Sequence, residues 1–304
     1  MLKLLKNVVK AFARSLVRAR LNWWPVSPEQ AEKLAIQTKA YPSIFGSLNY
    51  RRQVNLPAGI QMELGFADVI ERSLLTTGHW DPLVEKCLQS LLNPGDTFLD
   101  VGANIGYFSM MASKIVGDQG IVVSFEPSAR ALTKLTSHAC LNQCRNLLVC
   151  SHAVGETTSR TYLNWAAPSN IGGSTINRGI PSQGAIEPIL VRRLDDVCRD
   201  LSLKPNLIKM DIEGFELFAL RGAKETLATF HPNVVCELTE AFLRDHGQSS
   251  QALIQFMLDL GYRAFLLSLS STGQVEATAC TAENTPDDQA EVLFSFLKDP
   301  LARP

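Results

Sequence analysis

Short apolar runs alternate with longer amphipathic segments between residues 97 and 269. In the runs, apolar residues follow one another almost without interruption, which is typical of strands buried on both faces of a sheet. In the longer segments, apolar residues recur at three- and four-residue steps, which is typical of helices. The pattern predicts strands over 97–101, 120–127, 146–154, 206–212, 233–238 and 262–269, and helices over 107–116, 128–143, 214–230 and 249–261.

This alternation predicts a doubly wound α/β fold, in which a mostly parallel sheet is covered by helices on both faces. A further helix is expected over 80–92, with Asp81 as its N-cap and Pro82 at its first position. The alternation breaks off after residue 154 and resumes at 206, with two strand-like pieces between, at 159–165 and 188–194. Ligands of such sheets bind at the carboxyl ends of strands, where the winding order reverses.

Residues 1–20 carry a different pattern, with apolar residues at helical spacing, basic residues between them and no acid before Glu29. We therefore expect an N-terminal basic amphipathic helical segment over 1–40 and a separate domain over 41–304. Such a helix docks on its own domain or on the second subunit of a homo-oligomer. The alternatives are a peripheral position on an anionic membrane surface and an organellar transit peptide.

Composition limits the possible partners and compartments. The formal net charge of -1 gives no overall field that would attract nucleic acid, so we expect no nucleic-acid partner. The seven cysteines form no C-x-x-C pair, and we interpret them as reduced thiols in a reducing, cytoplasmic compartment. No apolar run approaches the ~20 residues of a membrane-spanning helix.

Polar residues gather in a glycine turn after the first strand of the alternating region, in the stretch FLDVGANIGYFSMM (98–111). Gly102 and Gly106 let a ligand approach the backbone, and Asn104 tolerates a left-handed conformation. The helix that starts there directs free N–H groups at the ligand. Glu126 ends the next strand, where an acid accepts both ribose hydroxyls of a nucleoside. Together the turn and Glu126 indicate a cofactor that contains adenosine.

The residues of the turn distinguish between three such cofactors. A nucleoside triphosphate requires a lysine after the turn, but Tyr107 follows Gly106. A dinucleotide requires G-x-G-x-x-G, but Asn104 stands at the second glycine position. S-adenosylmethionine has no phosphate and carries two cationic groups, which suit nearby carboxylates. The turn therefore favours S-adenosylmethionine, with Asp100 holding its ammonium group directly or through water.

Four more polar residues follow the later strands: His152, Asp211, Glu213 and Glu237. An alcohol that accepts a methyl group loses its proton, so His152 and Asp211 are candidate catalytic bases. His152 is alternatively a hydrogen-bonded residue at a strand end. Asp211, Glu213 and Glu237 are a weak candidate site for Mg²⁺. We favour no metal, with Asp211 and Glu213 binding backbone N–H groups of the following helix instead.

Taken together, these residues resemble the FkbM family of class I S-adenosylmethionine-dependent methyltransferases. The resemblance covers roughly residues 55–270 and leaves 1–40 and 271–304 outside. It rests on DVGANIGYFS (100–109), FEP (125–127), KMDIEGFE (209–216), ALRGA (219–223) and CELTE (236–240), with weaker support from GHWDP (78–82), SNIGGSTI (169–176) and RRLDDV (192–197).

The resemblance implies a seven-stranded sheet whose last strand, over 291–297, runs antiparallel. It also implies methyl transfer to a hydroxyl oxygen of a small molecule or glycan. Asp81 stands where the family pattern suggests Glu, which puts only the contact of that entry segment in doubt. Carried over residue by residue, the cofactor-binding residues are Asp100, Gly102, Ala103, Asn104, Gly106, Glu126, Pro127, His152, Ala153 and Asp211.

Two other functions remain open on the sequence: a nicotinamide-dependent oxidoreductase of Rossmann type, and a non-catalytic protein that binds the cofactor. We expect residues 1–80 and 154–206 to form the acceptor pocket. No pattern in these residues identifies the acceptor. Within them, SNIGGST (169–175) has the chemistry of a lid over the cofactor or of a simple hairpin turn.

Overall fold

The computed structural model describes residues 51–57, 59–165, 170, 173–177, 186–285 and 288–301. The chain divides into two compact units: Met1–Trp80 with Pro168–Asn170, and Asp81–Ala167 with Ile171–Pro304. The expected amphipathic helix over residues 1–40 lies outside the described residues. The proposed boundary between residues 40 and 41 therefore stays a prediction.

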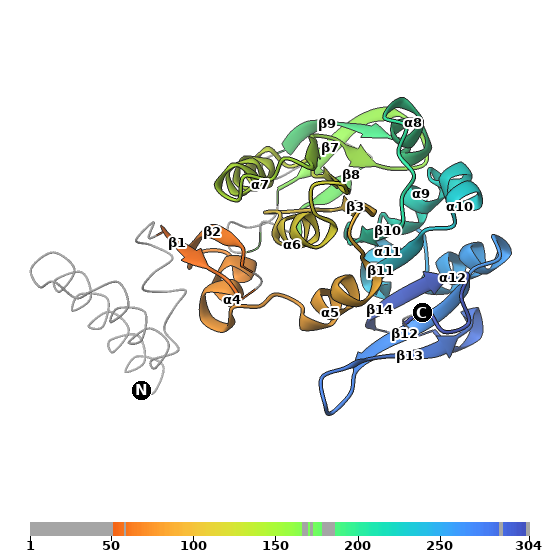
Figure 1. The fold of residues 1–304 in the computed structure, drawn as a ribbon. Coiled ribbons are helices and arrows are strands. Elements are labelled where there is room, and N and C mark those ends of the chain that lie inside the picture. Colours follow the sequence, from red (N-terminus) through yellow and green to blue (C-terminus); the bar gives the residue numbers. More distant parts are fainter. Residues whose placement is uncertain are drawn as a thin grey trace, which may run out of the picture. The chain divides into compact units, whose positions relative to one another are not determined.

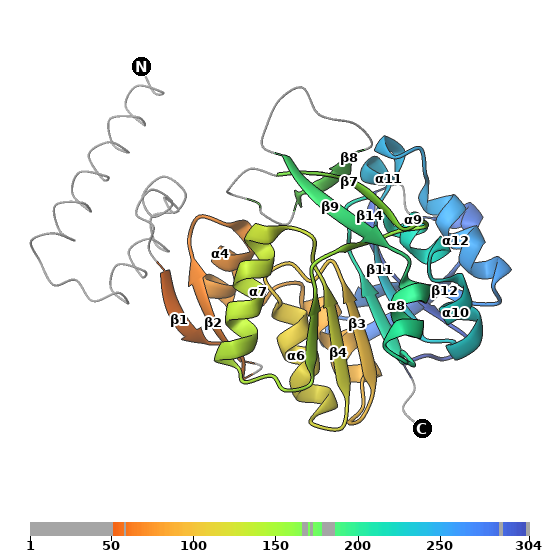
Figure 2. The same ribbon diagram turned by 90° about the horizontal axis from the view of Figure 1, so that it is seen from above.

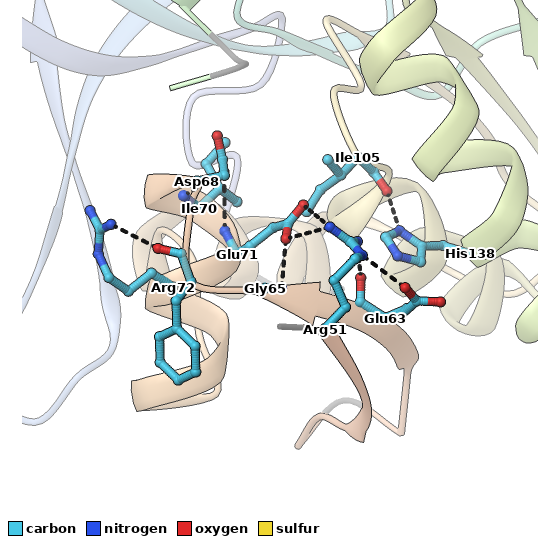
Figure 3. A network of polar contacts seen from close by, with 10 residues as sticks. Arg51, Glu63, Gly65, Asp68, Ile70, Glu71, Arg72, Ile105 and His138 are labelled. Atoms are coloured by element: carbon cyan, nitrogen blue, oxygen red, sulfur yellow. Dashed lines mark hydrogen bonds and ion pairs between the residues drawn. The ribbon is translucent and has the colours of Figure 1, made fainter. Parts of the chain in front are cut away.

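The described part of the first unit is a β-hairpin followed by a helix. Strands β1 (Arg51–Asn55) and β2 (Gln61–Gly65) pair antiparallel, and α4 (Val69–Thr77) begins at the N-cap Asp68. Figure 3 shows Arg51 between two acids, with its Nε 2.8 Å from Oε1 of Glu63 and its Nη1 3.2 Å from Oε2 of Glu71. Sequence periodicity predicts no helix at α4, because short strand-like pieces and turns are mixed through residues 41–80.

The second unit is built on an eight-stranded sheet in the order β13-β12-β14-β11-β10-β3-β4-β5 (Figure 1). Strands β5, β4, β3, β10 and β11 are parallel, and β14 runs antiparallel between β11 and β12. The bounds are β3 Thr97–Val101, β4 Ile121–Phe125, β5 Leu147–Cys150, β10 Leu207–Met210, β11 Asn233–Thr239, β12 Arg263–Leu269, β13 Val275–Cys280 and β14 Gln289–Ser295.

The doubly wound, mostly parallel fold class is confirmed, including the antiparallel strand expected near the C-terminus. The number of strands needs one correction. We expected seven, and β13 adds an eighth by pairing antiparallel with β12 at the edge of the sheet. Its alternation of small and polar residues, VEATAC, gave no strong strand signal.

Helices cover both faces of this sheet (Figure 2). On one face, α6 packs on β3 and β4, and α5 packs on β11 and β12. On the other face, Leu194, Leu220 and Met257 from α8, α9 and α12 share one core with Leu99 of β3. The bounds are α5 Pro82–Leu91, α6 Tyr107–Val116, α7 Ala129–Leu141, α8 Leu194–Asp200, α9 Glu216–Arg221, α10 Lys224–Phe230, α11 Glu240–Asp245 and α12 Ser250–Asp259.

Two predicted elements are each divided in the structure. The strand expected over 146–154 becomes β5 in the large sheet and β6 (Ala153–Val154) in a second sheet, ordered β6-β9-β7-β8. The other members of that sheet are β7 (Ser159–Asn164), β8 (Thr175–Asn177) and β9 (Ile186–Arg192). The helix expected over 214–230 becomes α9 and α10, which are separated at Gly222. Along the described parts of the chain, we find no helix with the length and apolar character needed to cross a membrane.

Candidate functional site

The turn between β3 and α6 adopts the backbone conformation that its residue types suggest. Gly102, Asn104 and Gly106 have φ angles of 81°, 50° and 87°, all in the left-handed region. The N–H groups of Gly102 and Ala103 both donate to the carbonyl of Phe125, each at 3.0 Å, which fixes the turn to the end of β4. Helix α6 begins directly after Gly106 and has no side-chain cap. The helix N-terminus is thus presented at the carboxyl edge of the sheet.

A buried histidine supports the same turn. His138 of α7 is 1% exposed, and its Nδ1 lies 2.8 Å from the carbonyl oxygen of Ile105 (Figure 3). Because a carbonyl only accepts hydrogen bonds, Nδ1 carries the proton. Sequence reasoning missed this residue, since a histidine inside an amphipathic helix has no local signal for such a contact.

Glu126 joins the turn to the start of α7. Its Oε2 accepts the N–H of Asn104 at 2.8 Å, and its Oε1 accepts the N–H of Ser128 at 2.8 Å. Burial raises the pKa of Glu126 to about 7, although the hydrogen bonds from Ser128 and Asn104 oppose the shift. The structure therefore brings Glu126 and the glycine turn together, as the sequence predicted from two separate strand ends.

Asp100 lies under the turn and not at its surface. The side chain is fully buried, and its Oδ2 accepts the hydroxyl of Ser109 on α6 at 2.5 Å. Ser124 of β4 donates to that same hydroxyl at 2.7 Å. Asp100 thus ties β3 to α6 and β4, and its contact with the ammonium group of a cofactor stays a prediction.

Lys209 is a site residue that sequence reasoning did not select. It lies within β10, is 5% exposed, and is the register partner of Asp100 on β3. Its Nζ is 3.3 Å from Oδ2 of Asp211, 3.9 Å from Oδ1 of Asp100 and 3.3 Å from the carbonyl oxygen of Gly102. Burial lowers the pKa of Lys209, but the carboxylates of Asp211 and Asp100 together raise it by a larger amount. The pKa of Lys209 therefore lies above its ordinary value. The side chain is therefore an ammonium ion at neutral pH.

Acidic side chains follow β10 and lie near the end of β11 and the start of β14. Glu237 of β11 faces Glu291 of β14 in register, and burial is the main cause that raises the pKa of both. Burial and the Asp211 carboxylate raise the pKa of Glu213 to about 7. Burial and neighbouring like charges disfavour ionisation, so the raised pKa values of Glu213, Glu237 and Glu291 favour their protonated forms. Within the described residues, no group of three or more His, Cys, Asp or Glu side chains is arranged to hold a metal ion.

The loop after β10 is closed by a different acid from those we expected. Glu216 accepts the N–H groups of Ile212 and Gly214 with its Oε1, at 3.0 and 3.2 Å. The sequence predicts that Asp211 and Glu213 bind backbone N–H groups of the helix that follows. Instead, Asp211 pairs with Lys209, and Glu213 adopts a left-handed backbone with φ of 54°. Glu216 is one helical turn further along, where its side chain reaches back to the loop.

His152 lies between β5 and β6, beside the end of β4. Its ring is centred 5.5 Å from that of Phe125, and its Nδ1 is 3.3 Å from the carbonyl oxygen of Ala153. Burial lowers the pKa of His152 below its ordinary value, so the ring is neutral at pH 7 and able to accept a proton. Ala153 is buried and pairs with Val191 in the small sheet, while Pro127 follows Glu126 into the start of α7.

Comparison with known families supplies the identity of this arrangement. A family described as "Methyltransferase FkbM domain" matches residues 100–264, which is more than half of the chain. The chain belongs to the FkbM methyltransferase family. The match begins at Asp100 and runs through the glycine turn, Glu126, Lys209 and Glu237. The sequence-based assignment to this family of class I S-adenosylmethionine-dependent methyltransferases is confirmed.

Individual relatives of this FkbM chain are distant. It is 25% identical over 183 residues to "Methyltransferase 1" of Beauveria bassiana, a match that covers 54% of this chain and 73% of that protein. It is 19% identical to the crystal structure of "Methyltransferase FkbM from Methylobacillus flagellatus KT", with a TM-score of 0.43, covering 75% of this chain and 53% of that one. A "SAM dependent methyltransferase from Aquifex aeolicus" is 16% identical, with a TM-score of 0.39, covering 73% and 92% of the two chains.

Proposed function

We propose that this protein transfers a methyl group from S-adenosylmethionine to a hydroxyl oxygen of a small molecule or glycan. The observation that carries the proposal is the junction of the glycine turn with Glu126, made by the hydrogen bond from the Asn104 N–H. This junction brings a turn that begins and ends with glycine beside a carboxylate, at the carboxyl edge of a parallel sheet. Family membership supports methyl transfer as the reaction.

The residues present fit such a cofactor. Among the described residues, Oδ1 of Asn104 is a buried acceptor without a hydrogen-bond partner, so it can take a donor from a bound ligand. The turn carries no lysine or third glycine for phosphates, and the nearby carboxylates suit a cationic ligand. Gly102, Ala103, Asn104 and Gly106 would hold the methionine end, and Glu126 would accept the ribose hydroxyls. Pro127, His152 and Ala153 would lie on the adenine side.

S-adenosylmethionine supplies an activated methyl group whose sulfonium is already a good leaving group. The chain then has to orient the acceptor hydroxyl, exclude water and take up the acceptor's proton; positioning alone contributes up to ~7–11 kcal/mol in favourable cases. His152 and Asp211 are the two candidate bases. His152 is neutral at pH 7, and Asp211 stands at the end of β10 with its side chain 34% exposed. A requirement for Mg²⁺ is not part of the proposal.

Equilibrium binding tests the cofactor. We expect isothermal titration calorimetry to detect S-adenosylhomocysteine and not NAD. Asp100→Ala and Glu126→Ala should each raise the dissociation constant by about tenfold or more, which is ~1.4 kcal/mol. Asp118→Ala is the matched control, because Asp118 is an exposed acid beyond the end of α6. Binding of NAD without S-adenosylhomocysteine would instead indicate the oxidoreductase alternative.

A further inference from the structure

Lys209 is a charged residue at a costly position. Strand β10, with the sequence LIKM, is buried at all four positions and lies between two parallel neighbours. Moving an ammonium ion out of water is unfavourable unless charged or polar partners compensate it. A leucine or valine would fill the strand without that cost, so the contacts of Lys209 should explain why a charge is placed there.

These contacts join two parts of the candidate site. The Nζ donates to the carbonyl of Gly102 at 3.3 Å, in the turn after β3. It also donates to Oδ2 of Asp211 at 3.3 Å, at the end of β10. The ammonium group lies over the ring of Phe108 of α6, with Nζ 5.3 Å from the ring centre. One side chain therefore holds the glycine turn and a carboxylate of the neighbouring strand together.

The third neighbour of the Lys209 ammonium group is Asp100. Its Oδ1 lies 3.9 Å from the Nζ of Lys209 and, as a buried atom, has no hydrogen-bond partner among the described residues. The separation is too long for a hydrogen bond, so Asp100 contributes charge and not direction. Direction comes from Gly102, which belongs to the proposed methionine end, and from Asp211, which is a candidate base. Lys209 therefore differs from a lysine whose ion pair only joins two strands, because its hydrogen bonds go to groups of the candidate site.

We propose that Lys209 is a positioning residue of the methyl-transfer site, which fixes the direction of the Asp211 carboxylate relative to the Gly102 turn. The inference rests on the proposed function, because the groups it positions are those expected to meet the methyl donor. Asp211 is one-third exposed and would otherwise be free to rotate into solvent. Held by Lys209, it presents its remaining lone pairs to the ligand.

A double-mutant cycle on S-adenosylhomocysteine binding tests this role. The wild type, Lys209→Met, Asp211→Asn and the double variant are compared by isothermal titration calorimetry, with circular dichroism as a check of folding. Lys209→Met keeps an unbranched side chain that is one atom shorter and removes the charge. We expect it to weaken binding about tenfold in the wild-type background and less than about twofold in the Asp211→Asn background, because Lys209 acts through Asp211. Lys209→Arg keeps a cationic donor and should recover part of the affinity.

Lys209→Met leaves Asp100 buried without a counter-charge, which can prevent folding. If it does, the same cycle is measured in an Asp100→Asn background, where that charge is absent. Wild-type binding with equal affinity in folded Lys209→Met would overturn the role of Lys209 and leave the proposed function intact. A loss that is the same with and without Asp211→Asn would also overturn it, since Lys209 would then act only on the fold. Failure of the wild type to bind S-adenosylhomocysteine would overturn both.

Discussion

Gly102, directly after β3, lies against the backbone of Asp211, directly after β10. A Cβ atom at this position would lie 1.9 Å from the carbonyl oxygen of Asp211, far inside van der Waals contact. Its φ of 81° is also unfavourable for any residue with a side chain. The glycine is thus required by the protein's own backbone, in addition to any approach of a ligand.

We expect Gly102→Ala to lower the free energy of unfolding by about 3 kcal/mol or more, or to prevent folding, because strain and a clash add. Gly95→Ala is the matched control: its φ is 90°, but a Cβ there would meet nothing within 4 Å. It should therefore cost only about 1–2 kcal/mol. Urea unfolding of both variants measures the difference, and equal losses would contradict the close contact with Asp211.

Glu126 should make cofactor binding depend on pH. Burial raises its pKa to about 7, so the carboxyl is protonated below that value and ionised above it. Hydrogen bonds to an ionised acceptor are roughly twice as strong as neutral ones. We expect the affinity for S-adenosylhomocysteine to rise several-fold from pH 6 to pH 8, as measured by calorimetry.

Glu126→Gln is the control for this pH dependence of binding, since its amide does not titrate.

The raised pKa of Glu126 also has a consequence for stability. The folded form binds the proton more tightly than the unfolded chain does, so stability is lost as pH rises from about 4.5 to about 7. The Gln variant should lack this part of the loss. A variant with the same pH profile as the wild type would show that another group titrates.

At the scale of elements, the predicted boundaries were wrong where two backbones meet. The periodicity of 214–230 continues across Gly222, but a Cβ at Gly222 would lie 2.0 Å from the carbonyl oxygen of Gly155. The chain bends there, α9 ends, and α10 begins two residues later. The strand over 146–154 is divided because its second half pairs with β9, a segment almost forty residues away in the chain.

Asp195 then becomes a capping residue for α10. Its Oδ1 accepts the N–H of Thr226 at 2.8 Å and its Oδ2 that of Glu225 at 3.2 Å, and the residue is 3% exposed. Asp195→Ala should lower the free energy of unfolding by about 2 kcal/mol. Asp196→Ala is the control, because Asp196 pairs with the partly exposed Arg193 and Arg199, and its loss should cost less than about 1 kcal/mol. Denaturant unfolding distinguishes them, and losses of equal size would argue against capping.

At the scale of the whole molecule, the net charge and the cysteines indicate in which compartment and with which partners the protein works. The 29 basic and 30 acidic residues nearly cancel, and the seven cysteines are free thiols. A cytoplasmic location agrees with such thiols and stays a prediction. Contact of residues 1–20 with a membrane or with a second subunit also stays a prediction, since that segment lies outside the described part of the chain.

The near-zero net charge predicts that the protein does not bind nucleic acid through a general electrostatic field. Fluorescence anisotropy with a labelled structured RNA at ~0.15 M salt should give a dissociation constant weaker than about 100 µM. The same titration at ~0.05 M salt serves as the control, because weak electrostatic binding strengthens there. Submicromolar binding at the higher salt would contradict a small-molecule or glycan acceptor.

The sequence by itself determined the alternation of strands and helices, the left-handed glycine turn and the acids at the strand ends. These depend on local periodicity and on backbone preferences of single residues, which a short stretch of chain already contains. Only the tertiary structure decided that β14 enters between β11 and β12, that Asp195 caps α10, and that Lys209 joins Gly102 to Asp211. Those features depend on which distant segments lie side by side, and the lateral order of strands is set by the packing of the whole sheet.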